Sequence, residues 1–383
     1  MKRVLRLAAA TCAASALLST GAQAWAAPAG GGTGTAPGYD KQDTLRRLAP
    51  QDLVIGSAVA GGGHHVDMPY PDPFPNDAQY REVLAEEFSS LSPENQMKWE
   101  FLRPQRDVWN FGPADEIVAF ARENHQVVRG HTLLWHSQNP TWLEQGDFSP
   151  EELREILREH IQTVVGRYAG QIQQWDVANE IFTDQGQLRT EENIWIRELG
   201  PGIIADAFRW AHEADPEAKL FFNDYGVEGV NPKSNAYYTL IQQLQAEGVP
   251  VDGFSVQGHL SIQYGFPGDL QRNLQRFDDL GLETAVTELD VRMVLPPGGE
   301  PTAEQLQKQA DYYGRTLEAC LAVEDCNSFT LWGFTDKYSW VPVFFPAEGE
   351  ATVMDEDFVP KPAYTRLQEE LAEARPGRQV TER

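Results

Sequence analysis

The sequence predicts an α/β protein folded as a single (β/α)8 barrel, often called a TIM barrel. Eight short apolar segments alternate with amphipathic stretches over about 330 residues, which matches the pattern and size of this fold. Polar and aromatic residues follow almost every apolar segment, as expected where barrel strands end at one face. The alternative is an open doubly wound sheet, which would place a Gly-x-Gly-x-x-Gly turn after the first strand. The segment "GGGHH" at residues 61–65 lacks that spacing.

The apolar segments are short, rich in β-branched and aromatic residues, and bounded by turn-forming or charged residues, as is typical of buried strands. We expect the eight strands within these segments, in chain order: "LVIGSAV" 53–59, "FSSLSPE" 88–94, "VVRGHTLLW" 127–135, "IQQWDVANE" 172–180, "LFFNDYG" 220–226, "GFSVQGHL" 253–260, "TAVTELDVR" 284–292 and "SFTLWGFTD" 328–336.

Helix signals lie between these segments. Residues 149–170 open with a Ser-x-x-Glu capping box, Ser149 with Glu152, and close on glycine. The stretch 231–248 also closes on glycine, 302–324 is a further long amphipathic stretch, and 361–374 follows the eighth strand. The sequence therefore predicts that each strand is followed by a helix.

The chain begins with features of a secretory signal peptide. A basic start is followed by an apolar run from Leu7 to Leu18 and by the small-residue sequence "AQAWAA". The apolar run is too short to cross a bilayer. We expect a signal peptide over residues 1–26, a Gly/Pro/Ala-rich linker over 27–44, the catalytic barrel over 45–375 and a tail over 376–383. The mature protein is then expected to be secreted.

Composition narrows the possible partners. The formal net charge of −26 argues against nucleic acid and against anionic membranes. Cys320 and Cys326 have no nearby histidine, so they make a poor zinc site. In an oxidising compartment we expect them to form a disulfide, the alternative being two buried thiols. We expect no metal, no cofactor and a monomeric protein.

Two acidic residues stand at predicted strand ends. Glu180 closes the fourth strand and Glu288 the seventh, so they would face each other across the barrel mouth. Glycosidic cleavage uses such a pair, with one carboxyl protonating the leaving oxygen and the other attacking or stabilising the anomeric carbon. A structural ion pair is the alternative, but neither strand end offers an obvious basic partner for both acids. Nearby aromatic residues suit stacking on sugar rings, and amides, histidines and a lysine suit hydroxyl recognition.

Several motifs are spread over nearly the whole mature chain: "ENQMKW", "GHTLLWHSQNPTW", "WDVANEIF", "NDYG", "VQGHL", "TELDV", "LWGFTDKYSW" and "PKPAY". Together, and in this order, they resemble glycoside hydrolase family 10, the retaining endo-β-1,4-xylanases. The resemblance implies xylan and xylo-oligosaccharides as substrates. The chain departs from the family pattern at Gly226, where Asn is common, and in long loops at 60–77 and 341–351. In the first loop we expect His64 and His65 to be surface residues.

The resemblance also implies roles for individual residues. Glu180 would be the acid/base, Glu288 the nucleophile, and Asn179 a ligand of the sugar 2-hydroxyl. The residues implied to line the cleaved sugar and its non-reducing neighbour are Glu94, Asn95, Lys98, His131, Trp135 and Gln138. Gln257 and His259 would contact the nucleophile, and Asp290 would orient His259. Trp332 and Trp340 would form an aromatic wall, and Tyr225 would stack on a sugar on the leaving-group side.

Two other functions fit part of the pattern. A retaining glycosidase of the same fold could act on aryl or plant-metabolite β-glycosides, and release of xylo-oligosaccharides from xylan distinguishes the two activities. A catalytically inactive sugar-binding barrel is disfavoured because both acids and their supporting residues are present. In the loop after Trp340 we expect one of Phe344 and Phe345 to pack beneath the loop and the other to extend the apolar wall, the alternative being that both are loop core.

Overall fold

The computed structural model describes residues 43–63, 65, 70–297 and 299–374. The predicted signal peptide 1–26, residues 27–42 of the predicted linker, and the predicted tail 376–383 lie outside the described residues. The boundaries proposed for these segments remain predictions.

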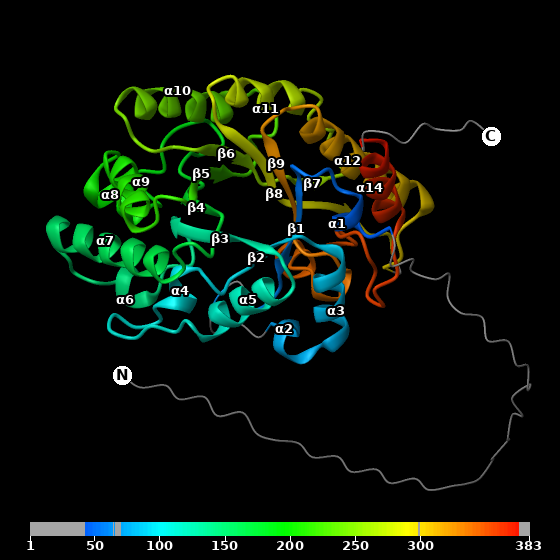
Figure 1. Cartoon of the computed structure of the whole chain (residues 1–383), viewed down its shortest axis with the longest axis horizontal. Coiled ribbons are helices and arrows are strands. Elements are labelled where there is room, and N and C mark those ends of the chain that lie inside the picture. The colour runs from blue at the N-terminus through cyan, green and yellow to red at the C-terminus, as the bar shows by residue number, and fades with distance from the viewer. Residues whose placement is uncertain (1–42, 64, 66–69, 298, 375–383) are drawn as a thin grey trace, which may run out of the picture. The chain divides into compact units, whose positions relative to one another are not determined.

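In the described part of the chain, eight parallel strands close into a barrel, which confirms the predicted fold class (Figure 1). Each strand pairs with the next, and the last pairs with the first, so the sheet has no free edge within the barrel. The barrel strands are β1 (Val54–Val59), β2 (Ser90–Pro93), β3 (Val127–Leu134), β4 (Gln174–Asn179), β5 (Lys219–Asp224), β6 (Gly253–Val256), β8 (Glu283–Val294) and β9 (Cys326–Leu331).

Two short strands extend the sheet beyond the barrel. The sixth predicted segment forms two strands, because Gly258 with φ of +83° turns the chain between β6 and β7 (His259–Ser261). Strand β7 pairs in parallel with the long end of β8, and β10 (Glu348–Gly349) pairs antiparallel on it. This extension lies at the carboxyl ends of the strands and therefore forms part of one side of the barrel mouth.

Helices surround the barrel, as Figure 1 shows, with α10 and α11 above the strands and α12 and α14 at the right. The longer ones are α3 (Ala78–Glu87), α5 (Gly112–Glu123), α7 (Pro150–Arg167), α9 (Ile203–Ala214), α10 (Pro232–Ala246), α11 (Leu270–Asp278), α12 (Ala303–Leu321) and α14 (Pro362–Glu373). The short ones are α1 (Leu45–Leu48), α2 (Pro73–Asn76), α4 (Trp99–Leu102), α6 (Thr141–Glu144), α8 (Ile194–Leu199), η1 (Asp336–Tyr338) and α13 (Val341–Phe344).

The predicted capping box of α7 is only half formed. The Ser149 hydroxyl accepts from the backbone N–H of Glu152 at 3.2 Å, as predicted. The Glu152 carboxylate, however, lies 2.6 Å from a guanidinium nitrogen of Arg106, and this ion pair takes the place of the return bond. Complete capping boxes occur instead at the starts of α10 and α12.

Close packing between strands explains one glycine of the third strand. A Cβ on Gly130 would lie 2.2 Å from the ring of Trp175 on the neighbouring strand, so only glycine fits there. Trp175 is fully buried, while Asp176, the next residue, is buried in a polar cluster with Arg129 and His131. The alternation of an apolar and a polar residue along β4 follows from the two faces of a strand.

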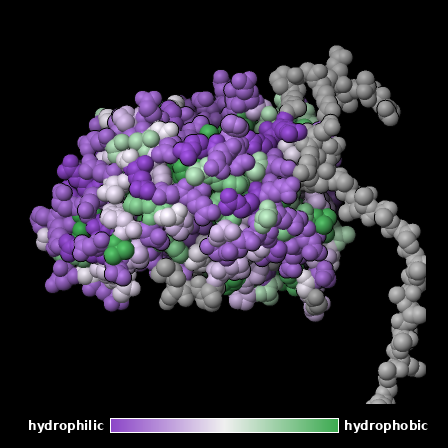
Figure 2. Space-filling view, turned by 60° about the horizontal axis from the view of Figure 1, so that its bottom comes forward, coloured by the Kyte–Doolittle hydropathy of each residue, from purple (hydrophilic) through white to green (hydrophobic). Residues whose placement is uncertain are grey.

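Cys320 near the end of α12 and Cys326 at the start of β9 form the expected disulfide. Because Cys326 begins its strand, the bridge lies at the opposite end of β9 from the barrel mouth. Figure 2 shows a largely hydrophilic face on which apolar side chains are scattered. Within the described residues, no helix combines the length and the apolar character that crossing a membrane requires.

Candidate active site

The carboxyl ends of the barrel strands surround a cavity of about 570 Å3. Both predicted catalytic acids and nearly all predicted binding residues line it: Glu94, Asn95, Lys98, His131, Trp135, Gln138, Glu180, Tyr225, Gln257, His259, Glu288, Trp332 and Trp340. Asn179 and Asp290 do not line the cavity, but they are buried directly behind residues that do. The strand ends thus bring together residues separated by up to about 250 positions in the sequence.

Glu180 immediately follows β4 and adopts a left-handed backbone with φ of +52°. Non-glycine residues rarely adopt this conformation, and it is held here by a bond from the Glu180 N–H to the carbonyl of Asn223 at 3.0 Å. One carboxyl oxygen accepts from Gln257 Nε2 at 3.0 Å and from Asn179 Nδ2 at 3.3 Å. The other oxygen lies 3.8 Å from Nδ1 of His136. The turn after the strand therefore aims this carboxyl into the cavity.

Glu288 is more enclosed and is bound on both oxygens. Asn223 Nδ2 donates to Oε1 at 2.7 Å, and Nε2 of His259 lies 3.2 Å from Oε2. Burial by itself raises the pKa of Glu288, but His131 and His259 outweigh it, so the pKa lies below its ordinary value. Glu288 is therefore held ionised, as a nucleophilic carboxylate has to be.

His259 is placed by strand register. Its Cα is paired with that of Asp290 across β7 and β8, and its Nδ1 lies 2.9 Å from Asp290 Oδ2. Burial favours the neutral ring, yet Asp290 and Glu288 together raise the pKa of His259 to about 10. Trp340 Nε1 donates to the same Asp290 oxygen at 2.8 Å. Asp290 thus binds both the imidazole of His259 and a tryptophan of the wall.

Gln257 differs from its expected contact. Its side chain donates to Glu180, not to the nucleophile, and it meets Glu288 only through its backbone carbonyl, which accepts from the Glu288 N–H at 2.8 Å. The reason is strand geometry: Gln257 directly follows β6, which pairs with β8, so its backbone continues the ladder while its side chain is free to bind Glu180.

On the side of the cavity built by β2 and β3, Lys98 lies at the centre of a polar cluster. Its Nζ donates to Gln138 Oε1 at 2.8 Å and to Asn95 Oδ1 at 3.0 Å, and lies 4.9 Å from the centroid of the Trp135 ring. Burial lowers the pKa of Lys98 and raises that of Glu94 to about 7. Amide, ammonium and carboxyl groups gathered beside an indole suit the hydroxyls and the apolar face of a sugar.

An aromatic wall follows β9 and includes residues of the next loop. Trp332 lies edge-on to His131, and Trp340 edge-on to His259. Both Phe344 and Phe345 lie against Trp340, with centroid distances of 5.3 and 5.6 Å, and both line the cavity. Both rings therefore lie at the cavity, and the way each ring is held tests the expectation that one packs beneath the loop while the other extends the wall.

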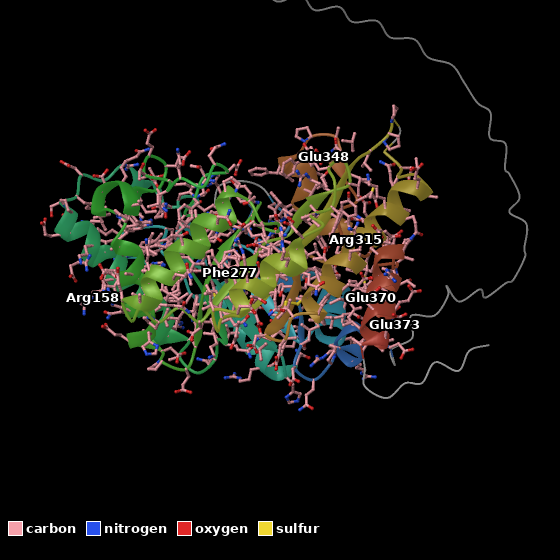
Figure 3. The ribbon with its side chains drawn as sticks, turned by 90° about the horizontal axis from the view of Figure 1, so that it is seen from above. Arg158, Phe277, Arg315, Glu348, Glu370 and Glu373 are labelled. Carbon is pink, nitrogen blue, oxygen red and sulfur yellow. A yellow bond between two sulfur atoms is a disulfide. The ribbon has the colours of Figure 1, made fainter. Side chains whose placement is uncertain are left out.

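The two rings are nevertheless held differently. Phe344 is 48% exposed, whereas the Arg292 guanidinium lies 4.2 Å from the Phe345 ring centroid. Arg292 is itself bound by Glu348, which is labelled in Figure 3, at 2.9 Å. Phe344 therefore extends the exposed wall, and Phe345 is its packed base. Of the two loop histidines, His64 lies outside the described residues, and His65 is partly exposed with its Nδ1 2.9 Å from Glu100.

The sequence prediction missed two functional residues. Asn223, which binds Glu288, lies near the end of β5, two positions before Tyr225. Asp176 lies 2.9 Å from Nδ1 of His131, and its pKa, raised by burial, is lowered overall by Arg129 and His131. Both residues lie within motifs that the sequence analysis quotes, Asn223 in "NDYG" and Asp176 in "WDVANE", so the motifs marked their positions but not their partners. The described residues contain no cluster of three or more His, Cys, Asp or Glu side chains suited to a metal ion.

Comparison with known proteins agrees with this geometry. Residues 51–370 match the model of glycosyl hydrolase family 10. Endo-1,4-beta-xylanase B of Thermotoga neapolitana is 42% identical over 341 residues, covering 89% of this chain and 95% of its own. Crystal structures of xylanase 10B from Thermotoga maritima and from Thermotoga petrophila, the latter in complex with xylobiose, each superpose with a TM-score of 0.79 at 42% identity. They cover 86% of this chain, and 98% and 97% of their own lengths respectively. The chain belongs to glycosyl hydrolase family 10.

Proposed function

We propose that the protein is a secreted endo-1,4-β-xylanase that hydrolyses internal β-1,4 bonds of xylan with retention of anomeric configuration. The observation that carries the proposal is the contrast between the two acids in one cavity. Glu288 is bound on both oxygens and kept ionised, whereas the side chain of Glu180 is 13% exposed and turned toward the cavity. Relatives crystallised with xylobiose and xylopentaose support a xylose-based substrate.

In the first step the Glu288 carboxylate attacks the anomeric carbon and forms a carbon–oxygen bond to it. The glycosidic bond breaks, and Glu180, acting as an acid, gives its proton to the departing oxygen. The leaving chain departs as an alcohol, and the remaining chain is covalently attached to Glu288. The hydrogen bonds from Asn223 and His259 keep the attacking carboxylate in place.

In the second step the ionised Glu180 removes a proton from water, whose oxygen attacks the same carbon. The bond to Glu288 breaks, and its carboxylate is restored. Two inversions give the sugar its original β configuration. Asn179 is buried beside Glu180, and its Oδ1 accepts from Asn223 at 2.9 Å; it remains our proposed ligand of the 2-hydroxyl of the sugar being cleaved.

Secretion and a monomeric state are part of the proposal. The support for secretion is the basic, apolar and small-residue pattern of residues 1–26. Edman sequencing of protein recovered from the culture medium should find a start at Trp25 or Ala27, which follow the two candidate cleavage sites. Light scattering should give the mass of one chain.

The test of the activity is the product profile on unbranched xylan. An endo-acting enzyme should lower viscosity early and release xylobiose and xylotriose, and proton NMR should show the β anomer as the first product. An α anomer would exclude retention. Hydrolysis of aryl β-glycosides without any release of xylo-oligosaccharides would instead support the aryl or plant-metabolite glycosidase.

A further inference from the structure

Tyr225 lines the cavity directly after β5, and two basic side chains hold its ring. The Nζ of Lys233 lies 3.6 Å from the centroid of its ring, and the same nitrogen donates to the Tyr225 carbonyl at 2.8 Å. Lys233 is 1% exposed and pairs with Asp224 Oδ1 at 2.7 Å. One face of the ring is therefore covered by a fixed cation.

The far end of the ring is held by Arg189. Its Nη2 donates to the Tyr225 hydroxyl at 2.7 Å. Arg189 belongs to the segment that follows Glu180, and this segment folds back so that the Arg189 N–H donates to the Ile181 carbonyl at 2.9 Å. The position of the ring is thus linked to the loop that begins at the acid.

Arg189 is not placed to bind sugar itself. Its side chain is 10% exposed, and its Nη1 pairs with Glu192 at 3.2 Å. Its Nε is buried and has no hydrogen-bond partner among the described residues. The polar groups of Arg189 are therefore either bound to other side chains or buried. Arg189 can affect a bound sugar only through its contact with Tyr225.

We propose that Arg189 is a positioning residue that sets the affinity for sugar on the leaving-group side of the cleft. It fixes the Tyr225 ring before substrate arrives, so that less conformational freedom is lost when a sugar stacks on it. This inference rests on the proposed function, because it assigns one side of the same cleft to the departing chain.

Two substrates separate the leaving-group side from the rest of the site. Xylotetraose places sugars on both sides of the cleaved bond, whereas β-xylobiosyl fluoride has a leaving group with no ring to stack. Arg189→Met should lower kcat/KM for xylotetraose about tenfold, the effect expected from a loosened aromatic contact. It should change kcat/KM for the fluoride by less than about twofold. Arg209→Met, an exposed arginine on α9, is the matched control and should change neither.

Tyr225→Phe removes only the hydroxyl that accepts from Arg189 and keeps the ring. If Arg189 acts through that hydroxyl, the double variant should be no worse on xylotetraose than either single variant. Additive losses, or an equal loss on both substrates, would overturn the proposal. Should Arg189→Met fail to fold, Tyr225→Phe alone has to show the selective loss, and the absence of that loss would also overturn it.

Assays of the wild-type enzyme on both substrates distinguish a failure of this inference from a failure of the proposed function. If the wild-type enzyme hydrolyses neither substrate, the proposed function is wrong, and the role of Arg189 falls with it. If it hydrolyses both, and the ratio of the two kcat/KM values is the same in Arg189→Met, only the positioning role is wrong.

Discussion

The Nε2 of His259 lies 3.2 Å from Oε2 of Glu288. Each group stabilises the charged form of the other: the pKa of His259 is raised to about 10, and the pKa of Glu288 is lowered. The stability contributed by His259 is fully present below its ordinary pKa of 6.5 and is lost as pH rises through about 10. The stability contributed by Glu288 is present above its ordinary pKa of 4.5 and is lost as pH falls through its lower folded value.

The contributions of both groups are therefore fully present together from about pH 4.5 to about pH 6.5, and the contribution of His259 declines between about pH 6.5 and about pH 10. His259→Gln should lower the melting temperature most between about pH 4.5 and pH 6.5, and the difference from wild type should shrink as pH rises from about 6.5 toward 10. Calorimetry across the pH range measures it. A difference that is constant with pH would mean that His259 stabilises the fold by packing and not by charge.

The same variant should alter the pH dependence of catalysis. Without the imidazolium the pKa of Glu288 rises, so the acid limb of kcat/KM should move to higher pH. A xylobioside with a good leaving group isolates the step in which Glu288 attacks. His212→Gln, an exposed histidine of α9, is the control and should leave the limb in place. An unshifted limb in His259→Gln would show that His259 does not set the ionisation of the nucleophile.

The two acids should differ in their response to leaving-group quality. Glu180→Ala should spare the first step for substrates with good leaving groups, which need little protonation. The second step should then stall, and azide should restore turnover. Glu288→Ala should be inactive on every substrate. Equal losses on good and poor leaving groups in both variants would contradict the assignment.

The disulfide should affect stability without affecting catalysis. Cys320 and Cys326 are 6 positions apart and lie at the opposite end of β9 from the cavity. Closing so short a loop stabilises by about 2 kcal/mol, so the double alanine variant should lose about that much free energy of unfolding in urea. Its kcat/KM on xylan should equal that of wild type. Two titratable thiols in the unfolded, unreduced wild type would refute the bridge.

Alanine variants of Phe344 and Phe345 should distinguish a residue that binds xylan from one that stabilises the fold. Phe344→Ala removes an exposed part of the wall, so xylan binding should weaken by about 1 kcal/mol while the melting temperature barely moves. Phe345→Ala is the matched variant, and it should lower the melting temperature because the ring lies between Arg292 and Trp340. A lower melting temperature in both variants, with an unchanged KM, would make the loop a packing element only.

The sequence by itself determined the barrel and the position of its acids. Strand and helix signals are local, since they depend on apolar periodicity and on capping residues within a few positions of each other. A barrel strand has one end at the active face, so the motifs at residues 175–180 and 287–290 are sufficient to place Glu180 and Glu288 at that face.

Only the tertiary structure decided which polar group meets which. Asn223 was not singled out, because its bond to Glu288 joins β5 to β8, and no local pattern encodes the distance across a barrel. Gln257 reaches Glu180 for the same reason. Glu152 leaves its predicted capping bond because Arg106, from another segment, binds it. A sequence pattern specifies the face of a strand on which a residue lies, whereas the partner depends on strand order, register and the competition among all neighbouring groups.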